Sequence, residues 1–160
     1  MFPAQLHSSQ KLKFKNLFRL LKKRRSTQDD VLFAKTHEIV FAKTNCLNCA
    51  NCCKTHSPLF TQKDIESISV HLKMKPSEFV SKYLLLDEEG DWIFHSTPCP
   101  FLLPDNACSI YTHRPQACKE YPHTNRKKMY QVETITLKNA GICPAVQEIL
   151  TVITQKLNVR

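Results

Sequence analysis

The residues best suited to chemistry in this sequence are its eight cysteines, which fall into two groups. The first group is compact and follows the spacing C-x-x-C-x-x-C-C: Cys46, Cys49, Cys52 and Cys53. The second group is dispersed: Cys99, Cys108, Cys118 and Cys143. Two cysteines separated by two residues turn their thiolates toward one point and leave backbone amides for the sulfurs, so this spacing recurs in zinc and iron–sulfur sites. The sequence therefore predicts that the eight cysteines bind metal.

The spacing leaves the identity of the metal open. Two of the cysteines, Cys99 and Cys143, precede proline, and bacterial ferredoxins likewise combine C-x-x-C-x-x-C with a Cys-Pro ligand. By that analogy Cys46, Cys49 and Cys52 hold three corners of a [4Fe-4S] cluster, and a Cys-Pro cysteine holds the fourth. The alternative is zinc, with the eight thiolates shared between up to two closed tetrahedral sites.

Adjacent cysteines raise a geometric question. Neighbouring side chains point in different directions, so Cys52 and Cys53 are not expected to reach one small ion together. One of them would then serve a second metal, a larger cluster or another role. Three histidines near the cysteines are further candidate ligands, although surface or core positions are commoner for this residue: His56, His113 and His123.

The compartment bears on whether the cysteines are thiols or disulfides. An even number of cysteines allows four disulfides. A secretory signal, however, needs an uninterrupted apolar run, and the longest near the start is Leu20–Leu21. No stretch approaches the roughly 18 apolar residues of a membrane span. The expected location is the reducing cytoplasm, where thiols stay available for metal.

Charge is distributed unevenly along the chain, whose net charge is +9. Residues 1–25 carry eight Lys and Arg and no acidic residue, whereas the rest carries 15 basic against 14 acidic side chains. Phe14, Leu17, Phe18 and Leu21 have helical spacing within this basic segment. We therefore expect a basic amphipathic helix that contacts an anionic membrane surface or nucleic acid, or simply docks by its aromatic side. This pattern predicts an N-terminal helix or tail at 1–28 and a metal-binding domain at 29–160.

The remaining elements must position the cysteines. Thr61 and Asp64 resemble a capping box and predict a helix to about Leu72; Pro76 starts another to about Leu86. A last helix is expected from 144 to about 157, and residues 31–43 are buried as helix or strand. Short strands are predicted at 92–94 and 129–137. The expected fold is α+β: a small, mainly helical, metal-stapled domain with a short antiparallel sheet and its cysteines in loops.

These motifs together resemble the YkgJ-type cysteine-cluster (CxxCxxCC) family, described as a zinc- or iron-chelating domain. The resemblance rests on C-x-x-C-x-x-C-C at 46–53, Cys-Pro-Phe-Leu at 99–102, and Cys-Ser-Ile-Tyr-Thr-His-Arg-Pro-Gln-Ala-Cys at 108–118 followed by Tyr121-Pro122. It spans about residues 44–146. The flagellin lysine N-methylase has a similar pattern, which implies an iron–sulfur-dependent protein-modifying enzyme as the alternative to a structural or accessory metal chelator.

The other motif residues are expected to support the ligands. Arg114 precedes proline and presents a guanidinium to carbonyls or carboxylates, while Tyr111 and Tyr121 would cover the metal sites. The sequence contains no nucleophile–base pair separable from the cysteines, and its catalytic residues are unknown. Four carboxylates are expected to be solvated helix residues: Asp64, Glu66, Glu78 and Glu120. With only two glycines, the chain has no glycine-rich phosphate loop.

Overall fold

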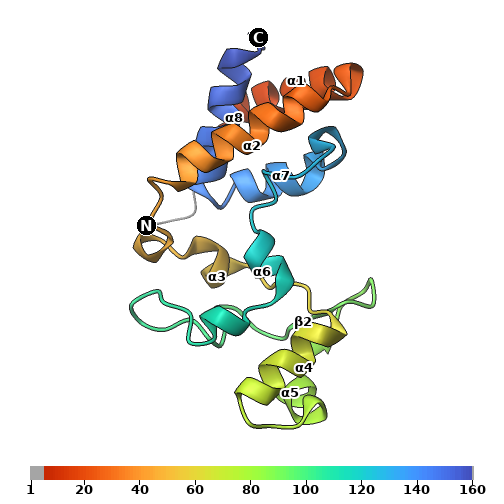
Figure 1. Cartoon of the computed structure of the whole chain (residues 1–160), viewed down its shortest axis with the longest axis vertical. Coiled ribbons are helices and arrows are strands. Elements are labelled where there is room, and N and C mark those ends of the chain that lie inside the picture. Colours follow the sequence, from red (N-terminus) through yellow and green to blue (C-terminus); the bar gives the residue numbers. More distant parts are fainter. Residues whose placement is uncertain (1–5, 160) are drawn as a thin grey trace. The chain divides into compact units, whose positions relative to one another are not determined.

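Helices account for most of residues 6–159, the part of the chain that the computed structural model describes (Figure 1). Their contacts divide the chain into two units. Unit 1 joins Met1–Asn45 to Pro122–Arg160, and unit 2 is Cys46–Tyr121. The sheet has two strands among the described residues, so the expected small, mainly helical fold with a short antiparallel sheet is confirmed. The boundary at residue 28, expected from charge, stays a prediction.

Unit 1 is built from four α-helices and one short 3-10 helix among its described residues: α1 (Ser8–Arg24), α2 (Thr27–Phe41), η3 (Met129–Gln131), α7 (Glu133–Ala140) and α8 (Pro144–Lys156). Its core joins the apolar sides of α1 and α8, with Phe33 and Val40 from α2 and Met129 from η3. The predicted helix from Pro144 is confirmed, since proline at the first helical position loses no hydrogen bond.

The basic segment forms helix α1, as predicted, and its apolar side is part of the core. Phe14, Leu17, Phe18 and Leu21 are each at most 2% exposed. The helix ends at Arg24, and the next residue, Arg25, has a left-handed backbone and donates its N–H to the Leu21 carbonyl at 2.8 Å. Of the expected arrangements, docking by the aromatic side is therefore the one that α1 adopts. Burial of four large apolar side chains removes much apolar surface from water, which stabilises this packing.

Unit 2 consists of short elements: η1 (Cys46–Asn48), α3 (Asn51–Thr55), α4 (Gln62–His71), α5 (Pro76–Tyr83), β1 (Leu84–Leu86), β2 (Trp92–Phe94), η2 (Tyr111–His113) and α6 (Gln116–Glu120). Strands β1 and β2 are antiparallel, with Leu84 opposite Phe94. The tight turn between them uses Gly90 at a φ of 84°. A small core lies against this hairpin: Phe60, Ile65, Ile68, Phe79, Leu84, Phe94, Phe101 and Ile110.

Among the predicted helices and strands, several hold in detail and two are wrong. The capping box at Thr61 and Asp64 and the strand at 92–94 are confirmed, and residues 31–43 fall largely in helix α2. The helix from Pro76 ends at Tyr83 instead of continuing to Leu86, because the next three residues pair with β2.

The predicted strand at 129–137 is helical instead. The carboxylate of Asp30 accepts the backbone N–H groups of Lys128 and Met129 at 2.7 and 2.9 Å, which fixes the start of η3. In α7 the Thr136 hydroxyl donates to the Val132 carbonyl at 2.8 Å. Tertiary contacts thus outweigh the β propensity of the alternating Tyr, Val and Thr residues. None of the helices in the described part of the chain has the length and apolar character needed to cross a membrane.

Unit 1 should lose stability in mild acid through His37. The ring lies 2.8 Å from the Thr124 hydroxyl and stacks on Phe41, and burial lowers its pKa although the charge of Glu38 opposes this. The folded state therefore binds fewer protons than the unfolded state, in which the ring titrates near 6.5. This contribution is complete above about pH 6.5 and is lost as the pH falls through the lowered pKa.

The check is the melting temperature of the full chain at several pH values between 5 and 8. His37→Gln is expected to flatten the acid side of this profile, even though it also removes a ring stack. Thr124→Val removes the hydrogen-bond partner but keeps a titrating ring, so the slope should remain. An unchanged slope in His37→Gln would show that another group is responsible.

Candidate metal centre

The structure places seven of the eight predicted ligands in unit 2 and the eighth, Cys143, in unit 1. All eight are thiols. Cys143 is the residue before α8, where its N–H donates to the Asn139 carbonyl at 2.8 Å and its side chain packs against the core of unit 1. The cysteines are not all in loops, since Cys52 and Cys53 lie on α3 and Cys118 lies on α6.

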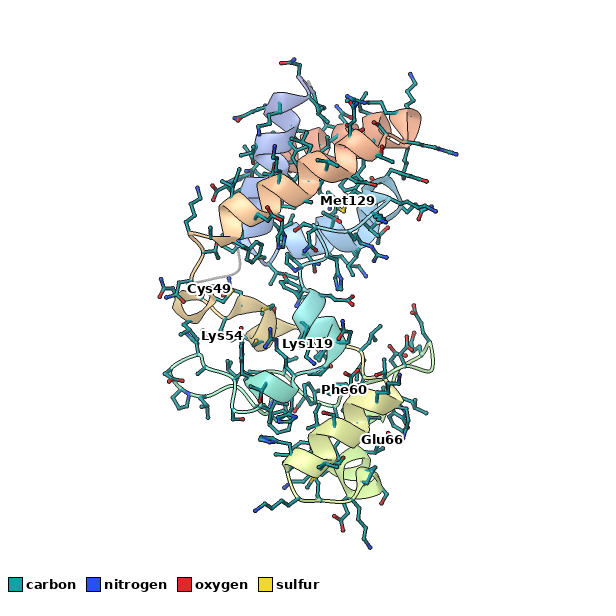
Figure 2. The ribbon with its side chains drawn as sticks, in the orientation of Figure 1. Cys49, Lys54, Phe60, Glu66, Lys119 and Met129 are labelled. Atoms are coloured by element: carbon teal, nitrogen blue, oxygen red, sulfur yellow. The ribbon has the colours of Figure 1, made fainter. Side chains whose placement is uncertain are left out.

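The compact group forms a tight backbone knuckle. The N–H groups of Cys49 and Ala50 both donate to the Cys46 carbonyl, at 3.1 and 2.9 Å. Ala50 adopts a left-handed conformation that turns the chain into α3. Lys54 then reaches back from α3 and donates to the Cys49 carbonyl at 2.8 Å (Figure 2). The four cysteines of this group therefore sit on one short, internally bonded segment.

Cys53 joins the compact group of cysteines to the Cys-Pro segment of unit 2. The N–H of Cys99 donates to the Cys53 carbonyl at 2.8 Å, which ties the Cys-Pro segment to α3. Leu102 in turn forms an isolated antiparallel bridge with Cys108. The first of these contacts joins residues 46 positions apart, and the second brings Cys108 to the same segment.

Cys52 and Cys53 do not diverge as expected: their sulfurs are 3.9 Å apart. Successive side chains on a helix are about 100° apart and not opposed as on a strand, so suitable rotamers can bring them together. Two sulfurs bound to one tetrahedral metal at about 2.3 Å lie roughly 3.8 Å apart. The spacing of this pair therefore suits a shared ion.

The thiols of unit 2 influence one another's ionisation. Burial raises the pKa of Cys99 to about 11 and that of Cys118 to about 12, and the charge of Cys53 contributes in both cases. The pKa values of Cys46 and Cys108 are also raised, first by burial and then in part by Cys53. These thiolates repel one another, and a bound cation would relieve that repulsion.

Cys53 differs from its neighbours. The pKa of Cys53 is lowered to about 7, first by a hydrogen bond from the Cys52 thiol and then by the Lys54 ammonium, against the effect of burial. A thiolate is the form that binds metal. Cys53 is thus the thiol most readily available as an anion at neutral pH among those with a shifted pKa.

Within residues 6–159, no group of three His, Cys, Asp or Glu side chains stands in an arrangement that would hold a metal ion. The donor set around Cys53 is nevertheless made of sulfur, which suits zinc and iron–sulfur clusters and not magnesium or calcium. Metal sites of this kind commonly close only when the ion binds, because binding and folding are coupled.

Asp64 positions one of the thiols, a role that the sequence did not reveal. It was expected to be a solvated helix carboxylate, but it is buried. One oxygen accepts the backbone N–H and the hydroxyl of Thr61, at 2.9 and 2.7 Å, and the other accepts the Gln116 N–H at 2.9 Å. Gln116 begins α6, the helix that carries Cys118, so Asp64 links α4 to a cysteine segment.

Replacing Asp64 with alanine is expected to destabilise the chain by about 2–4 kcal/mol, because it removes one half of the capping box of α4 and leaves buried donors without an acceptor. Metal affinity should fall about 10–100-fold, the usual cost of losing support around metal ligands. Urea unfolding and a metal-competition titration measure the two effects.

Glu66 supplies the control for this substitution. It lies on the same helix and is exposed, with a hydrogen bond from the Gln62 side chain at 2.9 Å (Figure 2). Glu66→Ala should change stability by no more than about 0.5 kcal/mol. Equal effects of the two substitutions would contradict the linking role of Asp64.

The remaining candidate residues have other contacts. Arg114 donates to the Tyr111 carbonyl at 2.8 Å, as expected of this guanidinium, and lies over the Tyr111 ring at 3.8 Å. Tyr111 is 62% exposed, so it supports Arg114 instead of covering a metal site. His113 stacks on His71, and the His56 ring lies 2.8 Å from the Thr55 hydroxyl. His123 belongs to unit 1.

A polar surface hollow lies beside α6. Its volume is about 450 Å³, and it is lined by Thr61, Lys63, Asp64, Ser67, His113, Arg114, Gln116 and Lys119. Three of these residues are permanently cationic, and the only carboxylate among them already accepts three hydrogen bonds. The hollow is thus electropositive and adjoins the helix of Cys118.

Comparison with known proteins gives one positive result. The model of the family CxxCxxCC, described as "Putative zinc- or iron-chelating domain", matches residues 45–144. The match covers all eight cysteines and more than half of the chain. No curated protein and no solved structure matches the chain.

Proposed function

The chain belongs to the CxxCxxCC family, and from this premise we propose that it is a metal-chelating cysteine-cluster protein with a structural or accessory role. The observation that carries the proposal is the position of Cys53, which bonds to the Cys99 segment, lies beside the Cys52 sulfur and acts by its charge on the Cys46, Cys108 and Cys118 thiols. The proposed ligands are the eight cysteines, and the proposed cofactor is zinc or an iron–sulfur cluster, with [4Fe-4S] as the iron form.

The residues of unit 2 have different proposed roles in metal binding. Cys53 supplies the first thiolate, and Cys52 lies at the sulfur–sulfur distance of a shared ion. Cys99 and Cys118 retain their protons until a cation displaces them, so metal uptake should release protons. Asp64 and Lys54 hold the backbone of two ligand segments in place. A reducing cytoplasm is the proposed location, because it keeps the thiols unoxidised.

The test is elemental analysis together with a visible absorption spectrum, on full-length protein purified without oxygen. One or two zinc ions per colourless chain would establish the structural chelator. Iron with acid-labile sulfide and absorption near roughly 400 nm would establish the cluster form. Metal-free protein, with all thiols titratable and no zinc or iron taken up on titration, would refute the proposal.

An iron–sulfur-dependent protein-modifying enzyme is the alternative function. One observation favours it: the electropositive hollow adjoins α6 and is large enough for a side chain of another protein. If the chain contains the cluster, a reduced sample should then modify an acceptor protein, and the substitution Lys63→Ala in the hollow should weaken acceptor binding. A zinc-only protein would exclude this alternative.

The basic helix α1 has a proposed role of its own. Its apolar side is buried and its cations are exposed, so we propose that it presents positive charge to an anionic partner, a membrane surface or a nucleic acid. Metal binding by unit 2 does not require this contact.

A further inference from the structure

The two units differ strongly in charge. Unit 1 contains 16 Lys and Arg against 5 Asp and Glu, whereas unit 2 contains 7 against 9. The positive charge of the protein therefore belongs to unit 1 and not to the metal-binding cysteines of unit 2. A strongly basic surface attracts polyanions through counterion release.

Helix α1 displays a row of cations along one side. Lys11, Lys15, Arg19 and Lys23 are spaced four residues apart and are all exposed. Residues four apart on a helix lie about 6 Å apart along its axis and are turned by about 40°, so the row winds along the exposed part of the helix for most of its length. The opposite side of α1 is in the core of unit 1.

Tertiary structure adds a second basic segment to this row. Arg126, Lys127 and Lys128 are exposed and follow α1 by about 100 residues in sequence. Three contacts anchor their loop at the carboxyl end of α1. Asp30, in the first turn of α2, accepts the Lys128 and Met129 N–H groups. The Arg25 guanidinium lies 5.9 Å from the centre of the Tyr130 ring, and Lys22 pairs with Glu133 at 2.5 Å. Helix α1 also contacts η3 and α7 directly. We call the α1 row and residues 126–128 the composite basic surface.

We propose that the composite basic surface binds the phosphate backbone of a nucleic acid. This inference deepens the proposal that α1 meets an anionic partner, and it selects nucleic acid over a membrane. A helix that lies in a membrane interface inserts its apolar side, but Phe14, Leu17, Phe18 and Leu21 are buried in the protein. Leu12, at 56% exposure, is an isolated apolar side chain on α1 and adds little area for lipid.

The test measures binding of full-length, metal-loaded protein to a fluorescein-labelled 20-base-pair duplex by anisotropy at several salt concentrations. The logarithm of the affinity should fall linearly with the logarithm of salt, by about 0.9 per phosphate contact. Arg126→Gln with Lys127→Gln should weaken binding and reduce this slope by about 2, one unit for each lost contact. Both side chains are exposed, so the double variant should fold normally.

Lys35→Gln with Lys138→Gln is the matched control, because it removes the same charge elsewhere in unit 1. Lys35 is exposed and lies on the side of α2 away from Asp30 and His37, the residues that contact segment 124–129. Lys138 is exposed near the end of α7, five residues after Glu133. This variant should keep the salt slope of the unmodified protein. Equal losses of duplex affinity in the two double variants would overturn the proposal, because binding would then depend on the total charge of unit 1 and not on the composite basic surface.

Two further results distinguish this proposal from the membrane alternative and from the metal proposal. Association with phosphatidylserine vesicles without binding to the duplex would overturn it and assign α1 to a membrane. Metal content is measured on every sample, since the inference concerns unit 1 only. If protein that takes up no metal binds the duplex, this inference stands and the metal proposal fails. If protein that contains metal does not bind the duplex, this inference fails and the metal proposal stands.

Discussion

Replacing Cys53 with serine should reduce metal affinity by more than about 100-fold. Loss of a residue that merely supports a ligand costs about 10–100-fold, and Cys53 is expected to bind the metal itself. Serine is close in size but keeps its proton at neutral pH, so it supplies neither the thiolate nor its charge. The sulfur of Cys53 is 3.9 Å from that of Cys52, and its lowered pKa of about 7 leaves a substantial fraction of this thiol ionised at neutral pH.

The same substitution should destabilise unit 2 in the presence of metal. Structural zinc sites contribute about 10–16 kcal/mol of binding energy that is coupled to folding, so a chain that binds metal weakly loses most of that stabilisation. Trp92, the single tryptophan, lies on β2 and reports the unfolding of unit 2 by fluorescence. Affinity itself is measured by competition with a chromophoric chelator.

Leu47→Ala is the control for the Cys53 substitution. Leu47 is in the same knuckle and its side chain is 51% exposed; its carbonyl accepts a hydrogen bond from the Asn106 side chain, a contact that alanine preserves. Its metal affinity should equal that of the unmodified protein. Cys143→Ser tests the eighth cysteine in the same assay, and a loss like that of Cys53 is expected if it is a ligand. Undiminished metal binding by Cys53→Ser would contradict the central position of this thiol.

Replacing Phe18 with alanine should destabilise unit 1 by about 3–5 kcal/mol, the usual cost of removing a buried phenylalanine ring. The side chain is fully buried and packs with the apolar sides of α2 and α8. Because most domains are stable by only about 5–15 kcal/mol, this loss should move the urea midpoint followed by circular dichroism substantially. The measurement also tests whether α1 is a part of the core.

Leu12→Ala gives the matched control on the same helix. Leu12 is 56% exposed, so its truncation should change stability by no more than about 0.5 kcal/mol. Similar effects of the two substitutions would show that α1 is not packed as described. Deleting residues 1–25 is consequently a poor test of the basic surface, since it would remove four core side chains together with the charges.

The capped and patterned elements were predictable because their signals are local. The Thr61 and Asp64 capping box, the strand at 92–94 and the helix from Pro144 all depend on residues close together in sequence. The segment 129–137 was predicted wrongly because its helical start depends on Asp30, about 100 residues earlier. The local alternation of Tyr, Val and Thr residues does not reveal the contact with that distant carboxylate.

The cysteine-cluster family could be predicted from the sequence alone, because the number and spacing of the thiols are properties of the covalent chain. Three other features became visible only in the folded chain: the bond between the Cys99 segment and Cys53, the contact of Asp64 with α6, and the position of Arg126–Lys128 at the carboxyl end of α1. The reason is physical: each of these features is a contact between residues distant in the chain, which arises only when burial of the two small cores brings their segments together.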